Sequence, residues 1–218
     1  TFALLRNSTQ RKHFFRWFRS FRRDYLLKNK QPWLTFDAID YLNSLSLKGM
    51  KIFEYGSGGS TLFWLNLGAE CVSVEHNPDW YELMHPHFAD TDRIDYRLVL
   101  PEPSENKEAQ DIADPNLYLS DDVTFSECNF RKYVCQIDLF PDNIFDIVLV
   151  DGRARPSCIK HASKKVKIGG LIVLDNSDRE YYLRMTANLL QDFDRRIFQG
   201  VAPGVTWFTE TSIFIRRV

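Results

Sequence analysis

The fold of this chain is decided by one stretch, Lys51-Ile52-Phe53-Glu54-Tyr55-Gly56-Ser57-Gly58-Gly59-Ser60-Thr61. Its apolar first half is typical of a short buried strand, and its glycines predict a sharp turn that opens a helix over residues 62–67. Glycines at 56, 58 and 59 permit positive φ angles and leave space for a ligand against bare backbone. Ser60 and Thr61 are good helix-capping residues. The stretch therefore predicts a nucleotide-type site between a strand and a helix.

The charge beside this turn selects the ligand. Glu54 stands two residues before the first glycine, at the carboxyl end of the predicted strand. A carboxylate there repels the pyrophosphate of a dinucleotide, which binds at the positive end of a helix, and Thr61 replaces the third glycine of the dinucleotide pattern. S-adenosylmethionine carries an ammonium, a sulfonium and no phosphate. The pattern therefore favours S-adenosylmethionine and disfavours a dinucleotide oxidoreductase.

A second acid follows at the spacing that a nucleoside site requires. Residues 71–75 are typical of a strand, and Glu75 ends it 21 residues after Glu54. An acid about 20 residues further on, at the tip of the next strand, commonly accepts hydrogen bonds from a ribose diol. We therefore predict that Glu75 binds the ribose, and that His76 or Asn77 borders the adenine.

Strands and helices alternate along the rest of the chain. Residues 145–150 are almost continuously apolar, as in a central parallel strand that is covered on both faces. The alternation indicates a doubly wound, mostly parallel α/β sheet. Strands are predicted at 51–55, 71–75, 94–100, 145–150 and 171–174, with a closing antiparallel pair at 195–198 and 211–215. Helices are predicted at 36–45, 62–67, 78–88, 130–137, 156–168 and 179–193.

Right-handed crossovers bring the polar residues at the strand tips to one edge of the sheet. These residues are Glu54, Glu75, Asp151, Asp175 and Asn176. The polar residues 101–129 also follow a strand tip, so we expect them on the ligand side, where specificity is set.

Four motifs at these strand tips stand in a recognisable order: Glu54-Tyr55-Gly56-Ser57-Gly58, then Glu75, then Val150-Asp151-Gly152, then Gly169-Gly170-Leu171-Ile172-Val173-Leu174-Asp175-Asn176. Together they resemble the motifs of class I S-adenosylmethionine-dependent methyltransferases, over residues 32–218. The resemblance implies an enzyme that transfers methyl groups, with a Rossmann-like sheet of seven strands of which the last is antiparallel. It implies that the cofactor contacts Glu54, Tyr55, Gly56, Ser57, Gly58, Ser60, Thr61, Glu75, His76 and Asp151.

A narrower resemblance is to the catechol-type, divalent-metal-dependent O-methyltransferases. Asp151, Asp175 and Asn176 match the positions that bind magnesium in that family, and three oxygen ligands with open places suit Mg²⁺ or another hard divalent cation. Such a metal lowers the pKa of an acceptor hydroxyl. A second interpretation stays open, in which Asp151 touches cofactor or substrate and the Asp-Asn pair caps the next helix.

The sequence departs from that family where a catalytic base is expected. The catechol type has a lysine three residues after the first aspartate, whereas this chain has Ala154 there, between Arg153 and Arg155. Arginine keeps its proton and is a poor base, but it binds carboxylates and phosphates well. We therefore predict that Arg153 or Arg155, together with Asp151, forms the catalytic side and orients an anionic or hydroxylated acceptor.

The predicted reaction is methyl transfer from S-adenosylmethionine to an oxygen of a small molecule, with or without a divalent cation. A nitrogen acceptor, which needs no metal, remains an alternative. So does a non-catalytic S-adenosylmethionine-binding protein that acts through its basic N-terminus. The net charge of −1 and the missing aromatic tetrapeptide of the amino-methylating enzymes argue against a nucleic-acid substrate.

Residues 1–31 form a separate basic segment. Residues 1–30 hold nine Lys or Arg and a single acid, Asp24. Phe14, Phe18, Phe21 and Tyr25 recur at helical spacing, which predicts a basic amphipathic helix of about five turns. Three interpretations stay open: the aromatic face packs on the domain, the helix contacts a membrane surface or an acidic partner, or it covers the active site.

Composition sets the remaining limits. With 44% hydrophobic content among 218 residues, residues 32–218 can form one methyltransferase domain. No apolar run approaches the roughly 20 residues that span a bilayer, and the charged N-terminus does not resemble a signal peptide. Four cysteines without metal or disulfide spacing are typical of free thiols in a reducing compartment: Cys71, Cys128, Cys135 and Cys158. We expect a cytoplasmic protein, membrane-associated if residues 1–30 bind lipid, and the sequence does not decide whether it is a homo-oligomer.

Overall fold

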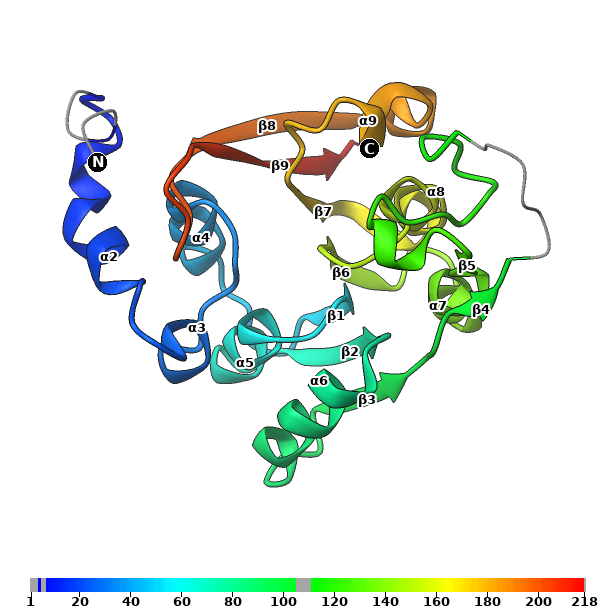
Figure 1. The fold of residues 1–218 in the computed structure, drawn as a ribbon, viewed down its shortest axis with the longest axis horizontal. Helices are drawn as coiled ribbons and strands as arrows, with labels where there is room; N and C mark the ends of the chain where they lie inside the picture. The colour runs from blue at the N-terminus through cyan, green and yellow to red at the C-terminus, as the bar shows by residue number, and fades with distance from the viewer. Residues whose placement is uncertain (1–3, 5–6, 105–110, 218) are drawn as a thin grey trace.

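The centre of the structure is one sheet of seven strands, in the order β3-β2-β1-β6-β7-β9-β8 (Figure 1). The computed structural model describes residue 4, residues 7–104 and residues 111–217. The strands of this sheet are β1 (Lys51–Tyr55), β2 (Glu70–Glu75), β3 (Ile94–Leu98), β6 (Phe145–Val150), β7 (Val166–Asp175), β8 (Phe193–Gly200) and β9 (Thr209–Arg216). A separate ladder joins β4 (Glu102–Pro103) to β5 (Cys128–Asn129).

This topology confirms the predicted Rossmann-like sheet with an antiparallel last strand. Neighbouring strands from β3 to β7 are parallel, and β9 is antiparallel to both β7 and β8. The carboxyl ends of β1, β2, β6 and β7 therefore lie along one edge of the sheet. We call this the ligand edge; its strands end at Tyr55, Glu75, Val150 and Asp175.

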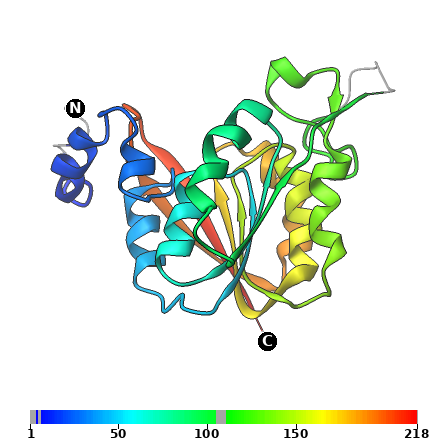
Figure 2. The ribbon, with the colours of Figure 1, turned by 90° about the horizontal axis from the view of Figure 1, so that it is seen from below.

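Helices cover both faces of the sheet (Figure 2). One face packs against α4 (Phe36–Asn43), α5 (Gly59–Asn66), α6 (Pro78–Met84) and η2 (His85–Phe88). The other packs against α7 (Arg131–Val134), η4 (Cys135–Leu139), α8 (Arg155–Lys165), α9 (Tyr181–Arg184) and η5 (Ala187–Leu190). Because successive residues of a strand point to opposite faces, Ile52 joins the first core, and Phe53 and Tyr55 join the second.

Some predicted helices are shorter in the structure. The helix predicted over 156–168 ends at Lys165, because β7 begins at Val166, where it pairs with Phe145. The helix predicted over 179–193 is reduced to α9 and η5. Between them the Thr186 hydroxyl donates to the Tyr182 carbonyl (2.9 Å), a bond that competes with the helical ladder.

The basic N-terminal segment is not one long helix. It forms η1 (Arg11–His13), α2 (Phe14–Arg19) and α3 (Tyr25–Lys28), and the chain turns before α3 at Asp24, whose φ is +58°. Trp17 is buried, whereas Phe18 and Phe21 are exposed, because the Trp17 indole donates to the Val205 carbonyl (2.6 Å). Of the three interpretations, packing of the aromatic face on the domain therefore does not hold for Phe18 and Phe21, although Phe14 packs against the core. Residues 1–3, 5 and 6 of the predicted helix lie outside the described residues.

All four cysteines are free thiols. In the described part of the chain, no helix combines the length and the apolar character that crossing a membrane requires.

Candidate functional site

Two glycine loops meet at the ligand edge, one after β1 and one after β6. Gly56 has a φ of +90°, and a side-chain carbon there would lie 3.1 Å from the Gly152 Cα. A side-chain carbon at Gly152 would overlap the Tyr133 hydroxyl. The two loops therefore pack backbone against backbone, and the fold itself requires both glycines.

Gly58, by contrast, is not required by its own surroundings. Its backbone is extended, and the nearest atom to a side-chain carbon there would be in the Trp80 ring, at 3.7 Å. The neighbouring Gly59 differs, because a side-chain carbon there would overlap the carbonyl oxygen of Gln31. Gly58 thus leaves open space against bare backbone, which is what a cofactor lying on this loop requires.

Glu54 lies beneath the glycine loop. Its side chain is fully buried, and its carboxylate accepts hydrogen bonds from Thr61 Oγ1 (2.5 Å), Ser73 Oγ (2.6 Å) and Trp64 Nε1 (3.2 Å). Burial raises the pKa of Glu54, and these hydrogen bonds oppose the rise. Thr61 Oγ1 also accepts from the Gly58 N–H (3.0 Å). The structure therefore corrects the expectation that the cofactor contacts the Glu54 side chain, which instead supports the glycine loop from its buried side.

Tyr55 and Ser60 are also buried. The Tyr55 side chain points into the second core, where its hydroxyl donates to the Val134 carbonyl (2.8 Å). Its backbone oxygen accepts from the Asp151 N–H (3.2 Å) and links the two loops. Ser60 lies in the first turn of α5 and is 5% exposed. In this conformation neither side chain is open to a cofactor.

Glu75 joins the glycine loop to the end of β2. One carboxylate oxygen accepts from the N–H (3.1 Å) and the hydroxyl (3.0 Å) of Ser57. The other accepts from the N–H groups of His76 (2.8 Å) and Asn77 (2.9 Å). Burial alone would raise the pKa of Glu75, but the hydrogen bonds lower it below its ordinary value. Glu75 is therefore an ionised carboxylate at the place where a ribose acceptor was predicted.

Residues 111–129, the described end of the predicted loop, contact the ligand edge. Arg153 pairs with Asp122 (2.9 Å), and its guanidinium lies over the Phe125 ring at 5.3 Å. Arg153 Nε donates to His76 Nε2 (3.3 Å), and the His76 ring packs edge-on against Phe125 at 5.3 Å. The loop therefore lies on the ligand side, as predicted. His76 and Arg153 hold it there.

Arg155 is at the centre of the other half of the site. It is 9% exposed, and Nε donates to the Gly152 carbonyl (3.1 Å). Nη1 donates to the Asp175 carbonyl (2.5 Å) and to Asn176 Oδ1 (3.2 Å). Nη2 donates to the carbonyl (3.3 Å) and to Oδ1 (3.1 Å) of Asp151. A guanidinium has five N–H groups, and all five are used by these contacts. None remains to bind the molecule that accepts the methyl group. This corrects the expectation that Arg155 orients the substrate.

Asp151 and Asp175 have shifted acidities. Burial raises the pKa of both carboxyls, and Arg155 opposes the rise in each. The Asp151 carboxylate raises the pKa of Asp175 further, and Asp175 Oδ1 accepts from the Thr211 hydroxyl (2.9 Å). The Asp151 side chain is 22% exposed, whereas Asp175 is 5% exposed. Asp151 is therefore the carboxyl of this pair that an acceptor molecule can reach.

The predicted metal ligands do not fit a divalent cation in this arrangement. The side-chain oxygens of Asp151 and Asn176 both accept from Arg155, and the Asp175 carboxylate is engaged with Thr211. The guanidinium lies between the groups that would share the metal, and its positive charge repels a second cation there.

Sequence reasoning named Arg155 but missed its structural role, and it missed Asp121 altogether. Arg155 stands in the first turn of α8, where a cation opposes the helix dipole; that misplaced charge was a signal of a carboxylate partner. Asp121 accepts hydrogen bonds from Arg179 (2.6 Å) and from the hydroxyls of Tyr181 (2.6 Å) and Tyr182 (3.0 Å). It comes from an aperiodic polar loop and gave no signal.

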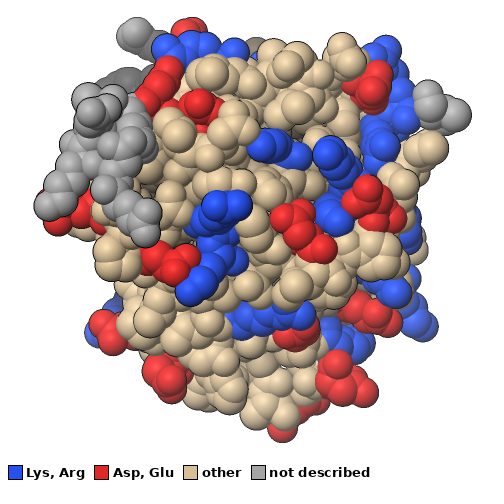
Figure 3. All heavy atoms as spheres, turned by 90° about the vertical axis from the view of Figure 1, so that its right-hand side faces the viewer, with Lys and Arg blue, Asp and Glu red and all other residues tan. Residues whose placement is uncertain are grey.

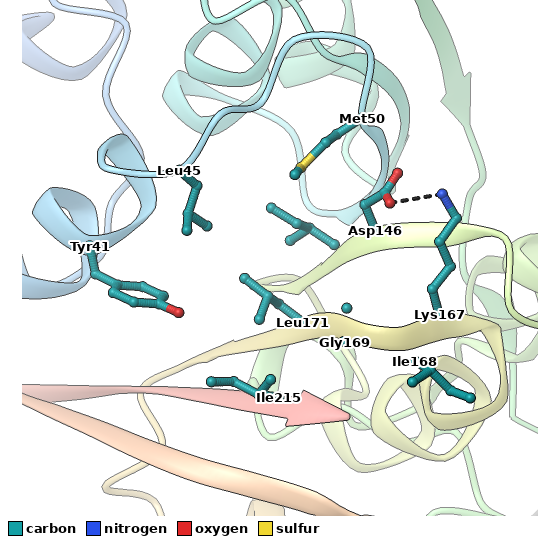
Figure 4. Close-up of a pocket in the computed structure, with 11 residues that line it drawn as sticks. Tyr41, Leu45, Met50, Asp146, Lys167, Ile168, Gly169, Leu171 and Ile215 are labelled. Carbon is teal, nitrogen blue, oxygen red and sulfur yellow. Dashed lines mark hydrogen bonds and ion pairs between the residues drawn. The ribbon is translucent and has the colours of Figure 1, made fainter. Parts of the chain in front are cut away.

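A cavity of about 280 Å³ lies away from the ligand edge (Figure 4). Its wall includes Tyr41, Leu45 and Met50, together with the ion pair between Asp146 and Lys167 (2.8 Å). Met50 precedes β1 and Asp146 stands near the start of β6. The cavity is therefore at the opposite end of the strands and is not part of the cofactor site.

Solved structures of methyltransferases share this fold. An O-methyltransferase from Bacillus cereus in complex with SAH is 16% identical, with 78% of this chain and 76% of that chain covered and a TM-score of 0.55. A proposed O-methyltransferase from Klebsiella pneumoniae is 13% identical, with 89% of each chain covered and a TM-score of 0.60. The tRNA (m1A58) methyltransferase TrmI from Aquifex aeolicus is 11% identical, with 86% of this chain and 71% of that chain covered and a TM-score of 0.50.

Sequence comparisons add nothing to this: no protein-family model matches the chain, and no curated protein matches it. At the identities of the structural neighbours the likeness concerns the fold alone. This chain has the fold of the class I S-adenosylmethionine-dependent methyltransferases.

Proposed function

We propose that this protein is an S-adenosylmethionine-dependent methyltransferase that methylates an oxygen atom of a small molecule. The observation that carries the proposal is Glu75, a carboxylate at the tip of β2 with its pKa lowered, whose hydrogen bond from the Ser57 hydroxyl can be exchanged for one from a ligand. It lies beside a glycine loop with open space at Gly58. S-adenosylmethionine supplies a methyl group on a positively charged sulfur, and its ribose offers the two hydroxyl donors that an acid at this position accepts.

Glu75 can accept a ribose hydroxyl without leaving another group unpaired. The Ser57 hydroxyl that donates to Glu75 also lies 2.7 Å from the Tyr96 hydroxyl. The Ser57 hydroxyl therefore keeps Tyr96 as a hydrogen-bond partner when a ribose hydroxyl replaces it at the Glu75 carboxylate. The N–H groups of His76 and Asn77 continue to orient the carboxylate. One hydrogen bond replaces another, which makes the exchange energetically small.

Residues 111–129 cover part of the ligand edge, and this favours a small methyl acceptor over a large one. The structural neighbours include both O-methyltransferases and a tRNA methyltransferase, so the fold does not choose the acceptor. Residues 111–129 lie against this edge through the contacts of Asp122 and Phe125. Figure 3 shows acidic and basic side chains interspersed on the face that it draws, and a nucleic-acid site would need a basic surface.

Calorimetric titration with S-adenosylhomocysteine tests the cofactor assignment. Glu75→Gln is expected to weaken binding roughly 10- to 100-fold, since hydrogen bonds to charged groups are worth about 1.5–3 kcal/mol. Glu70→Gln, at the exposed start of the same strand, is the matched control and should bind normally. No heat with the unmodified chain, or equal affinity of Glu75→Gln, would contradict the proposal.

We further propose that the reaction needs no divalent metal and that Asp151 receives the proton of the acceptor hydroxyl. The basis is the Arg155 guanidinium between the predicted metal ligands and the raised pKa of the partly exposed Asp151, which suits a general base. Release of S-adenosylhomocysteine in the presence of catechols and other phenols should be unchanged by EDTA. Asp151→Asn should lower that rate about 100-fold or more while S-adenosylhomocysteine binding is kept. Loss of activity in EDTA that Mg²⁺ restores would refute the metal-free reaction.

A further inference from the structure

We propose that the outward face of the N-terminal segment docks this protein on an anionic lipid bilayer. The docking face consists of Phe15 and Phe18 with Arg11, Arg19 and Arg22. Phe15, Phe18 and Arg19 lie in α2, where spacings of three and four residues place Phe15 beside both of the others. Arg11 lies in η1 before this helix, and Arg22 lies in the turn after it. The inference does not rest on the proposed function, because it concerns a surface built from other residues.

The aromatic part of the docking face is more exposed than a packed segment requires. Phe15 is 75% exposed and Phe18 is 67% exposed, while Trp17 on the inner side is 5% exposed. Phe14 connects the two outer rings, at 5.5 Å from Phe15 and 6.4 Å from Phe18. Aromatic rings that are exposed to this extent gain no free energy from apolar burial in water. Insertion into the interfacial region of a bilayer would bury them.

The charged part of the docking face is not compensated by the domain. Lys12 and Arg16, which flank it, pair with Asp37 (2.6 Å) and Asp40 (2.5 Å). Arg11, Arg19 and Arg22 are exposed, and within residues 7–104 and 111–217 no acidic side chain forms an ion pair with any of them. The uncompensated cations are therefore the ones that surround the exposed rings, which is the charge pattern that anionic lipid attracts.

The segment is fixed to the domain on its inner side. The Trp17 indole donates to the Val205 carbonyl (2.6 Å), and the Gly204 N–H donates to the Ser20 hydroxyl (2.9 Å). Gln10 donates to Asp37 (2.6 Å). α2 consequently lies at the outside of the molecule, beyond α4 (Figure 1). The docking face is thus presented in one orientation and does not depend on a folding step at the membrane.

The N-terminal segment also contacts a connection that leaves the sheet at the ligand edge. Residues 201–208 connect β8 to β9, and because β8 runs parallel to β7, this connection leaves the sheet at the ligand edge. α2 packs on it, as Figure 2 shows beside the N-terminus. The N-terminal segment is therefore fixed at the end of the strands where the ligand edge lies.

A bilayer accounts for the aromatic and the basic residues together. A nucleic-acid duplex or an acidic peptide would satisfy Arg11, Arg19 and Arg22 but would leave Phe15 and Phe18 without an apolar environment. The interfacial region of a membrane accepts aromatic rings and lies against anionic headgroups. The combination therefore favours lipid over the other anionic partners.

Vesicle co-sedimentation of the full chain tests this. Binding is expected to phosphatidylcholine vesicles with about 30% phosphatidylserine, to be far weaker without phosphatidylserine, and to fall as salt rises. Replacing Arg11, Arg19 and Arg22 by Gln should lower the partition coefficient roughly 100-fold, since each charge near the surface contributes about fivefold. Phe15→Ser with Phe18→Ser should lower it about 10-fold or more.

The control removes the same charge elsewhere. Lys48, Lys51 and Lys164 are exposed outside the N-terminal segment, and no acidic side chain of residues 7–104 and 111–217 forms an ion pair with them. Their joint replacement by Gln should leave vesicle binding unchanged. Thermal unfolding and S-adenosylhomocysteine titration should be unaffected in all three variants, which separates this result from the cofactor assignment. The proposal is overturned by absence of vesicle binding at low salt, by equal loss in the lysine control, or by tighter binding to duplex RNA or polyglutamate than to vesicles.

Discussion

Gly58→Val is expected to abolish binding of S-adenosylhomocysteine while the protein stays folded. The glycine has an extended backbone, and only the Trp80 ring lies within contact distance of a side-chain carbon there. The apo fold therefore tolerates a side chain, and Tm should fall by no more than about 3 °C. The bound cofactor would meet the two added methyl groups, so affinity should drop at least about 100-fold, with Gly58→Ala intermediate.

Two further variants serve as controls for Gly58→Val. Gly56→Val should lower Tm strongly, because Gly56 has a φ of +90° and a side-chain carbon there meets the Gly152 backbone at 3.1 Å. Glu75→Gln should weaken binding without a steric cause. If Gly58→Val binds S-adenosylhomocysteine as well as the unmodified chain does, the cofactor does not lie on this loop.

Arg155→Ala should destabilise the protein strongly. The substitution removes the cation beside Asp151 and Asp175, two carboxyls whose pKa values burial raises. It also removes the donor of five hydrogen bonds, so that their acceptors lose a partner. Removing one partner of a buried charge pair costs about 3–5 kcal/mol. For a chain of this size that corresponds to a fall in Tm of roughly 10 °C, measurable by calorimetry.

The comparison variants separate charge from geometry. The Tm of Arg155→Lys should remain well below that of the unmodified chain, because an ammonium has three N–H donors and cannot reach five hydrogen-bond acceptors. Arg155→Met combined with Asp151→Asn should be more stable than Arg155→Met alone, since it removes the unpaired carboxylate. Arg153→Ala, at a side chain 31% exposed, should cost about 1 kcal/mol or less. A Tm for Arg155→Ala within about 2 °C of the unmodified chain would show that Arg155 does not hold the site together.

The fold could be predicted because its signals are local. The apolar run at 145–150 became β6, and the glycines after residue 55 became the turn between β1 and α5. The polar residues at strand tips followed from the topology alone, because parallel strands end at a common edge. Glu75 and Asp151 accordingly lie at that edge in the structure.

Side-chain direction could be predicted only in part. The alternation of a strand puts Glu54 on the α5 side, but its partner Trp64 comes from the next helix. The acceptors of Arg155 come from two loops that only the assembled sheet brings together. In the N-terminal segment two faces have helical spacing, and the buried one was selected by a hydrogen bond from Trp17 to Val205, 188 residues away.

The place of β9 bears on how this chain is made. β9 separates β7 from β8, although it follows both in sequence. While the protein is being translated, the β7 backbone therefore has no neighbour on that side until residues 209–216 have left the ribosome. Unpaired strand edges associate with other chains, so a nascent chain halted before residue 209 exposes such an edge along β7.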